Sequence, residues 1–167
     1  MIKTVLFLLS AAALLPAQPN LMPWPSKITF KPGGLPIDQS FRIAFAGYQE
    51  PRLRAAADRF ITHLSAQTGI PIPIDIVPEP VQATLEIQCD HAGEPIQKLG
   101  VDESYRLDVT EKHARLTAPR PLGVLRGLET FLQLVEPGAQ NFAASAVSID
   151  DKPRFPWRGL HMDVSRH

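Results

Sequence analysis

The chain is poor in the features that mark several common classes of protein. Its 167 residues include a single cysteine, Cys89, so no disulfide can form within the chain. The 17 lysines and arginines balance the 17 aspartates and glutamates, which leaves a net charge of zero. Nucleic acids and anionic membranes attract proteins with a basic excess. We therefore expect neither as a partner.

Motifs for metal ions and phosphate groups are also missing. The sequence has no His-Glu-x-x-His run, and its five histidines lack metal-ligand spacing. No glycine-rich phosphate loop occurs either, because Gly33 and Gly34 lie in a proline-rich turn and Gly123 and Gly127 lie in a predicted helix. We expect no metal and no cofactor. The missing zinc motif argues against a zincin-like protease.

The first segment, MIKTVLFLLSAAALLPAQPN, has the layout of a secretory signal peptide. One cation, Lys3, precedes an apolar core that runs from Val5 to Leu15. A core of about eleven residues is too short to cross a bilayer. We predict a signal peptide over residues 1–17 and an exported protein, periplasmic or secreted, with no membrane attachment after cleavage. An uncleaved N-terminal anchor is the alternative.

The remaining sequence predicts an α/β (α+β) fold. Apolar residues recur with a helical period in two stretches, and with a period of two in most of the others. In the first helix Pro51 suits the first turn and Gly69 the C-terminal cap. The predicted helices are 50–69 and 120–138; the predicted strands are 27–30, 41–47, 71–77, 83–89, 104–110, 113–118 and 145–151.

The apolar stripes predict how these elements pack. Strands 104–110 and 113–118 form a hairpin, with Tyr105, Leu107 and Val109 on one face. The second helix has its stripe at Leu125, Leu128, Leu132 and Val135. Gly123 and Gly127, four residues apart, allow a close approach to the sheet. We expect two helices on one side of a mostly antiparallel or mixed sheet.

Three sets of polar residues could suggest catalysis. The acid pairs Asp102-Glu103 and Asp150-Asp151 border strands, and we interpret them as solvated turn acids rather than as acid–base pairs. Near the end of the chain, Asp163, Ser165 and His167 contain the residue types of a hydrolase triad. On a strand they would lie in a line about 6–7 Å apart, whereas a triad needs hydrogen-bond contact.

The last stretch, DKPRFPWRGLHMDVSRH, resembles the first barrel strand of the family 20 glycoside hydrolases, the β-N-acetylhexosaminidases. The segments DESYRLDVT, ARLTA and GVLRGLETFLQLV are similar to the small α/β domain that precedes the barrel in that family. The resemblance implies a zincin-like small domain over residues 20–151 and the start of a (β/α)₈ barrel over residues 152–167. Because such a barrel needs about 250 residues, we expect the chain to be an N-terminal fragment.

The same resemblance implies a chemistry. Family members remove terminal N-acetylhexosamine from glycans or chitooligosaccharides with retention, and the nucleophile is the substrate's own acetamido oxygen. An Asp-Glu pair on a later barrel strand assists, so we assign no catalytic residue here and expect this chain alone to be inactive. One residue is carried over: Arg158 matches the arginine that binds sugar hydroxyls. A structural arginine paired with a carboxylate at the lower end of the barrel is the alternative at this position. For the whole chain, the alternative is a stand-alone module that binds glycan or protein.

Overall fold

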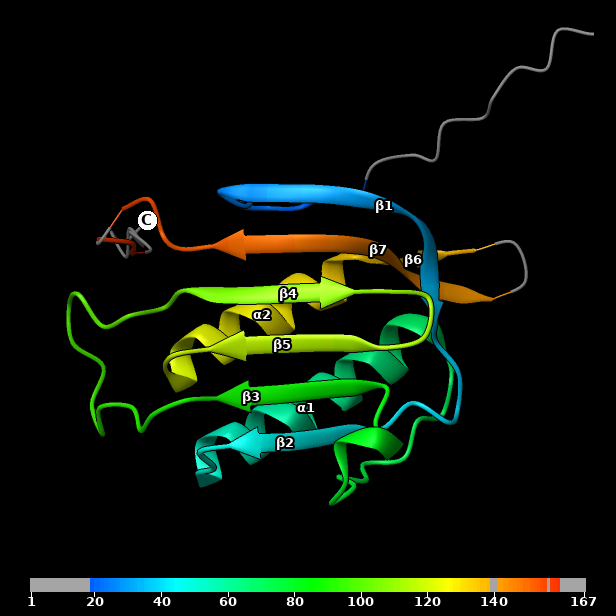
Figure 1. The fold of residues 1–167 in the computed structure, drawn as a ribbon, viewed down its shortest axis with the longest axis horizontal. Coiled ribbons are helices and arrows are strands. Elements are labelled where there is room, and N and C mark those ends of the chain that lie inside the picture. The colour runs from blue at the N-terminus through cyan, green and yellow to red at the C-terminus, as the bar shows by residue number, and fades with distance from the viewer. Residues whose placement is uncertain (1–18, 139–140, 156, 160–167) are drawn as a thin grey trace, which may run out of the picture.

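One mixed β-sheet with two helices makes up the structure, a computed structural model that describes residues 19–138, 141–155 and 157–159 (Figure 1). The strands are β1 (Lys27–Pro36), β2 (Ile43–Gly47), β3 (Leu85–Cys89), β4 (Tyr105–Val109), β5 (Ala114–Ala118), β6 (Val135–Pro137) and β7 (Phe142–Asp151). The helices are α1 (Pro51–Thr68) and α2 (Pro121–Gln133), and a short 3-10 turn covers Pro80–Gln82. This agrees with the predicted α/β class.

The strand order in the sheet is β1-β7-β4-β5-β3-β2, and β6 pairs with residues 142–144 at the start of β7. β3 runs parallel to both β2 and β5, whereas β4 runs antiparallel to β5 and β7. The sheet is therefore mixed. Both helices lie behind it in Figure 1, on the same face, as the apolar stripes predict.

Local sequence features mark the start of both helices and the end of α1. Each has a proline in its first turn, where the missing N–H has no intrahelical partner. α1 ends at Gly69, which adopts a left-handed conformation (φ 70°) and donates its N–H to the Ser65 carbonyl at 2.8 Å. α2 ends at Gln133, so Val135 lies in β6 and not on the helical stripe as predicted.

α2 approaches the sheet closely at the two glycines that the sequence singles out. A Cβ at Gly123 would collide with the Ser104 carbonyl, and one at Gly127 would collide with the Leu116 side chain. The core between helices and sheet is apolar, and it contains a three-ring cluster of Phe41, Phe60 and Phe131, with centroids 5.5–6.1 Å apart.

Two strand predictions were wrong. Gly33 and Gly34 do not end the first strand. β1 continues to Pro36, and the register with β7 shifts between Phe30 and Gly34, so the glycines form a bulge. The 71–77 stretch, whose alternate prolines suggest a sheet edge or bulge, does lie at the edge of the sheet beside β2, but it forms no strand. Its only pairing is an isolated bridge between Ile76 and Ile43, because its prolines cannot donate to a ladder.

Some predictions fall outside the described residues. The predicted signal peptide over 1–17 and the stretch 160–167, with Asp163, Ser165 and His167, belong to this group. Residues 152–155 and 157–159 are described and contain no strand. Within the described ranges, no helix is both long and apolar enough to cross a bilayer.

Candidate functional site

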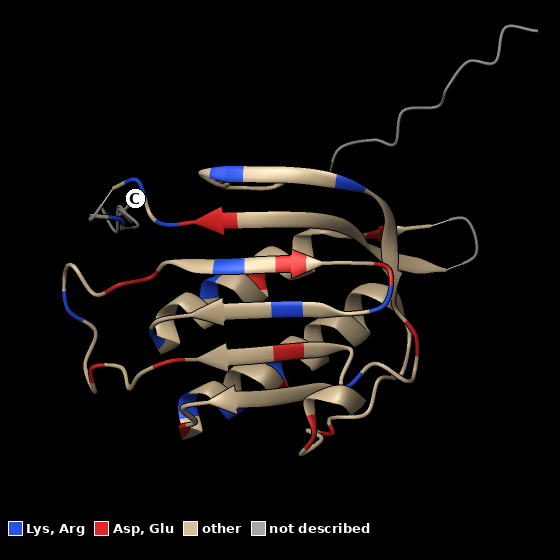
Figure 2. Ribbon diagram, in the orientation of Figure 1, with Lys and Arg blue, Asp and Glu red and all other residues tan. Residues whose placement is uncertain are grey.

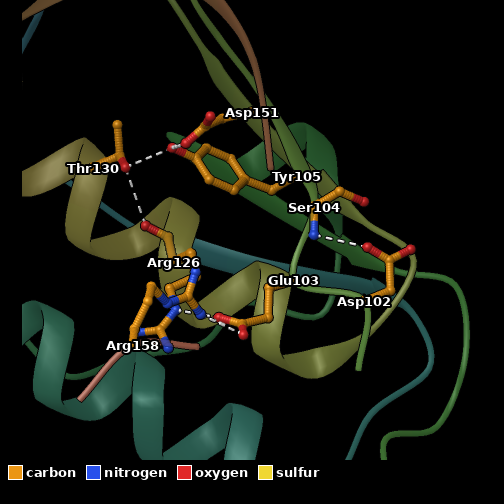
Figure 3. Close-up of polar contacts among 8 residues, drawn as sticks. All are labelled: Asp102, Glu103, Ser104, Tyr105, Arg126, Thr130, Asp151 and Arg158. Carbon is orange, nitrogen blue, oxygen red and sulfur yellow. Dashed lines mark hydrogen bonds and ion pairs between the residues drawn. The ribbon is translucent and has the colours of Figure 1, made fainter. Parts of the chain in front are cut away.

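A carboxylate shared by two arginines lies at the end of the sheet where β4 begins and β7 ends (Figure 3). The acid is Glu103, two residues before β4. One of its carboxylate oxygens, Oε2, accepts a hydrogen bond of 2.7 Å from Arg126 Nε on α2. The other, Oε1, accepts one of 2.5 Å from Arg158 Nη2, in the segment that follows β7. Three separate parts of the chain therefore meet at one carboxylate.

The two guanidinium groups control the charge of Glu103. Its side chain is only 10% exposed, against 49% for Arg126 and 41% for Arg158. Burial raises the pKa of a carboxyl group, but the hydrogen bonds and positive charges of the two arginines outweigh this effect and hold the pKa of Glu103 below its usual value. Glu103 is therefore a fixed anion at neutral pH.

A second polar cluster lies beside the first and joins β4 to α2 and to the end of β7. The Tyr105 hydroxyl lies 2.7 Å from Thr130 Oγ1 and donates to Asp151 Oδ2 at 3.2 Å. Asp151 Oδ1 also accepts bonds from the backbone N–H (2.8 Å) and hydroxyl (2.9 Å) of Ser26. Burial raises the pKa of Tyr105 well above its usual value, so this phenol stays protonated. The cluster fixes the point at which the chain leaves the sheet.

The two clusters border a cavity of about 370 Å³. Its lining comes from the segment before β1, from α2 and from the residues after β7; it includes Met22, Trp24, Glu103, Arg126, Phe155 and Arg158. Two of the aromatic side chains near it are exposed, Trp24 by 45% and Phe155 by 70%. The cavity thus combines apolar rings with charged hydrogen-bond donors and acceptors.

Arg158, the residue predicted to bind sugar, lies in this cavity and is paired with Glu103. The structural alternative also pairs Arg158 with a carboxylate, but with one at the lower end of the barrel, whereas Glu103 precedes β4. The pairing with Glu103 uses one N–H of a guanidinium that has five, so it does not decide between the two roles.

The two acids of each adjacent pair differ in burial and in their contacts. Asp102 is exposed and accepts a 2.9 Å bond from the Ser104 N–H, as expected of a turn acid. Its neighbour Glu103 is nearly buried between arginines, so the interpretation of Glu103 as a solvated acid was wrong. Asp150 is exposed, whereas Asp151 is only partly exposed and belongs to the tyrosine cluster.

From the sequence, Glu103 was misinterpreted as a solvated acid and Arg126 was not singled out. A signal for Glu103 was present: the period of two that places Tyr105, Leu107 and Val109 on the helix side places residue 103 there as well. For Arg126 the helical pattern indicates a position on α2 but not its partner. Among the described residues, no group of three or more His, Cys, Asp or Glu side chains could hold a metal ion.

The comparison with protein families decides the identity. Residues 21–134 match the family model described as "beta-acetyl hexosaminidase like". This range contains the whole helix-covered sheet except β6 and β7, together with Glu103 and Arg126. The chain belongs to the β-N-acetylhexosaminidase family.

Individual relatives agree with this assignment. The β-hexosaminidase subunit beta of Mus musculus is 35% identical over 186 residues, an alignment that covers 100% of this chain and 33% of the mouse protein. The subunit A1 of Dictyostelium discoideum is 28% identical and covers 100% of this chain and 31% of its own length. The chain thus spans about a third of the length of these two relatives.

A solved structure shows the same fold. The chitobiase of Flavobacterium johnsoniae superimposes with a TM-score of 0.80 at 36% identity, over 89% of this chain and 23% of the chitobiase chain. The β-N-acetylhexosaminidase of Streptomyces plicatus, solved with Thio-NAglucal, gives a TM-score of 0.67 at 25% identity over 91% of this chain. The predicted resemblance to family 20 and the predicted α/β fold class are confirmed.

Proposed function

We propose that this chain forms the N-terminal small domain of an exported enzyme that removes terminal N-acetylhexosamine from glycans or chitooligosaccharides. The observation that carries the proposal is the family match over residues 21–134. It is supported by the mouse hexosaminidase subunit, whose alignment covers the whole chain. Export is supported by the signal-peptide pattern of residues 1–17.

The proposed reaction is retaining hydrolysis in which the acetamido oxygen of the substrate attacks the anomeric carbon as the glycosidic bond breaks, and water then attacks the same carbon and opens the cyclic intermediate. As the glycosidic bond breaks, a carboxylic acid has to protonate the leaving oxygen, and such an acid works best with a pKa near the working pH. Glu103 does not fit that task, because two arginines hold its pKa low. We therefore place the catalytic Asp-Glu pair outside these 167 residues and propose that this chain alone does not hydrolyse substrate.

We further propose that Arg158 binds sugar hydroxyls. A guanidinium is a rigid fork of N–H donors that can meet two vicinal hydroxyl groups at once. Glu103 engages only Nη2 of Arg158. Most of the five N–H donors of a guanidinium remain for a ligand. The neighbouring Trp24 and Phe155 provide apolar surface, which the carbon face of a sugar can cover.

Hydrolysis of a chromogenic N-acetyl-β-glucosaminide tests the proposal. The assay compares the 167-residue chain with a longer protein that contains this chain followed by the proposed catalytic barrel. Activity in the longer protein alone is the expected result. Activity of the isolated chain above a heat-denatured control, or no activity in either protein, would contradict it. N-terminal sequencing of the protein made in its natural host tests export, with Gln18 expected as the first residue.

A further inference from the structure

We propose that the cavity beside the end of β7 is a docking surface for the catalytic barrel, with Met22 and Trp24 as its main apolar contacts. The inference rests on the proposed function, which places such a barrel after the small domain. It gives the small domain a task of its own, which is to hold the barrel in a fixed position.

The segment before β1 presents large apolar side chains to solvent although its backbone is anchored. Met22 is 82% exposed and Trp24 is 45% exposed. Between and around them, Leu21 is buried in the core, and the Met22 N–H donates to Gln133 Oε1 on α2 at 2.7 Å. Ser26 is bonded to the end of β7 through its N–H (2.8 Å) and its hydroxyl (2.9 Å). The apolar groups are therefore held outward at defined positions, and such preorganisation lowers the cost of binding a partner.

These side chains border a concave surface rather than a flat one. The cavity of about 370 Å³ has Met22 and Trp24 on one wall, Arg126 and Glu129 of α2 on another, and Phe155 on a third. Phe155 is 70% exposed. Single exposed apolar side chains are common on protein surfaces, but a group of them around one hollow is typical of a surface that a partner covers.

The polar groups of the cavity already satisfy one another, so a partner can cover them at little cost. Glu103 accepts a 2.7 Å bond from Arg126, and the Tyr105 hydroxyl is bonded to Thr130 and Asp151 (Figure 3). Among the described residues, no buried side-chain nitrogen or oxygen lacks a hydrogen-bond partner. A covering domain therefore leaves no polar group stranded, which would otherwise oppose docking.

The path of the chain favours the barrel over other occupants. β7 ends at Asp151, and residues 152–155 line the same cavity. Four residues span at most about 15 Å, so a domain that begins in this segment lies next to the cavity. Attachment to the same chain gives it a high effective concentration there, which a second copy or a free peptide lacks.

Charges at the rim of the cavity indicate what the docked surface carries. Lys152 and Arg154 line the cavity and are exposed, and neither forms an ion pair within the described part of the chain. Interfaces place opposite charges across from each other. We therefore expect the docked face of the barrel to be apolar at its centre and acidic at its rim.

Hydroxyl-radical footprinting, read by mass spectrometry, tests the docking. We expect Met22 and Trp24 to be oxidised about fivefold more slowly in the longer protein than in the 167-residue chain, because the core of an interface excludes water. Val81 is the control, since it is 91% exposed in the 3-10 turn and does not line the cavity. Its oxidation rate should be the same in both proteins. Equal rates at Met22 and Trp24 in the two proteins would overturn the proposal.

A matched pair of variants tests the same contact by trypsin digestion of the longer protein. Met22→Asp places a charge in the docked surface, so cleavage after Arg154 should become about tenfold faster. Val81→Asp makes the same kind of change outside the cavity and should leave the rate unchanged. Both side chains are exposed in the 167-residue chain, where circular dichroism should show that each variant folds normally. An unchanged cleavage rate in Met22→Asp would contradict the docking.

The same samples separate this inference from the proposed function and from other occupants. A longer protein that hydrolyses substrate but leaves Trp24 unprotected would overturn the docking alone. An inactive longer protein would overturn the proposed function, whatever the oxidation rate of Trp24. Protection of Trp24 in the 167-residue chain that is lost on dilution would identify a second copy as the occupant. Protection lost on removal of residues 1–17 would identify that segment instead. Either of the last two results would overturn the barrel as the occupant.

Discussion

The helix-covered face and the bare face of the sheet are built from alternate residues of the same strands. On β4, Tyr105, Leu107 and Val109 are buried beneath the helices, whereas Arg106 and Asp108 point to the other side. β3 and β5 follow the same alternation, with buried and partly or fully exposed positions in turn. The result is one apolar face and one face that carries charges of both signs. Figure 2 marks where these charged residues fall along the strands.

The two faces should contribute very differently to stability. Burial of large apolar side chains is worth about 1.5–3 kcal/mol each. The ion pairs of the bare face, in contrast, are long, and all of their side chains except Glu86 are exposed: Arg106–Asp150 at 3.8 Å, Arg115–Glu86 at 3.6 Å and Lys31–Asp108 at 3.9 Å. We therefore predict that substitutions on the helix-covered face lower the free energy of unfolding much more than substitutions on the bare face.

The largest effect is expected in the ring cluster that joins both helices. Phe131→Ala removes the α2 ring, which contacts Phe41 and Phe60 and is completely buried. The free energy of unfolding should fall by about 3–5 kcal/mol, because both the ring's burial and its packing are lost. Urea denaturation followed by circular dichroism measures it.

The matched control is Phe155→Ala, since that ring is 70% exposed. Its effect on the free energy of unfolding should stay within about 0.5 kcal/mol. Similar losses in the two variants would mean that burial does not distinguish these sites.

An intermediate loss of stability is expected at Tyr105, whose buried ring carries a hydrogen-bonded hydroxyl group. Tyr105→Phe keeps the buried ring but deletes the hydroxyl that contacts Thr130 and Asp151. We expect a loss of about 1 kcal/mol in the free energy of unfolding, the usual net value of such a hydrogen bond. Tyr48→Phe serves as the control, because its hydroxyl makes one 3.2 Å bond to Glu50 at a half-buried position. A larger loss at Tyr48 than at Tyr105 would contradict the ranking.

The two faces also explain how much of the fold the sequence could predict. Alternation along 104–110 and 113–118 reports burial directly, so the hairpin and its inward residues were predicted correctly. Strand partners are a different matter. The parallel pairing of β3 with β2 and β5 joins segments that are far apart in the sequence, and no local pattern records it. The bulge at Gly33-Gly34 could not be predicted from the local sequence either. The run Pro32-Gly33-Gly34 fits a turn and a bulge equally well.

The candidate site was predicted in part for a similar reason. Arg158 was found through its motif, but its carboxylate partner lies 55 positions earlier in the chain. Such a pairing depends on tertiary contacts between β4, α2 and the segment after β7. The residue pair Asp102-Glu103 illustrates the limit: the two acids are identical in charge and adjacent in sequence, yet one is exposed and the other is nearly buried.

The smallest effect is expected on the bare face, where Arg106 on β4 and Asp150 on β7 are directly opposite each other. Their side chains are 62% and 53% exposed, and the closest N–O distance is 3.8 Å. Water and salt screen a pair of this kind, and ordering two side chains offsets most of the attraction. A double-mutant cycle with Arg106→Gln and Asp150→Asn should give a coupling energy below about 0.5 kcal/mol, and 1 M salt should remove it. A coupling above about 1 kcal/mol at physiological ionic strength would show that the bare face is more than a solvated surface.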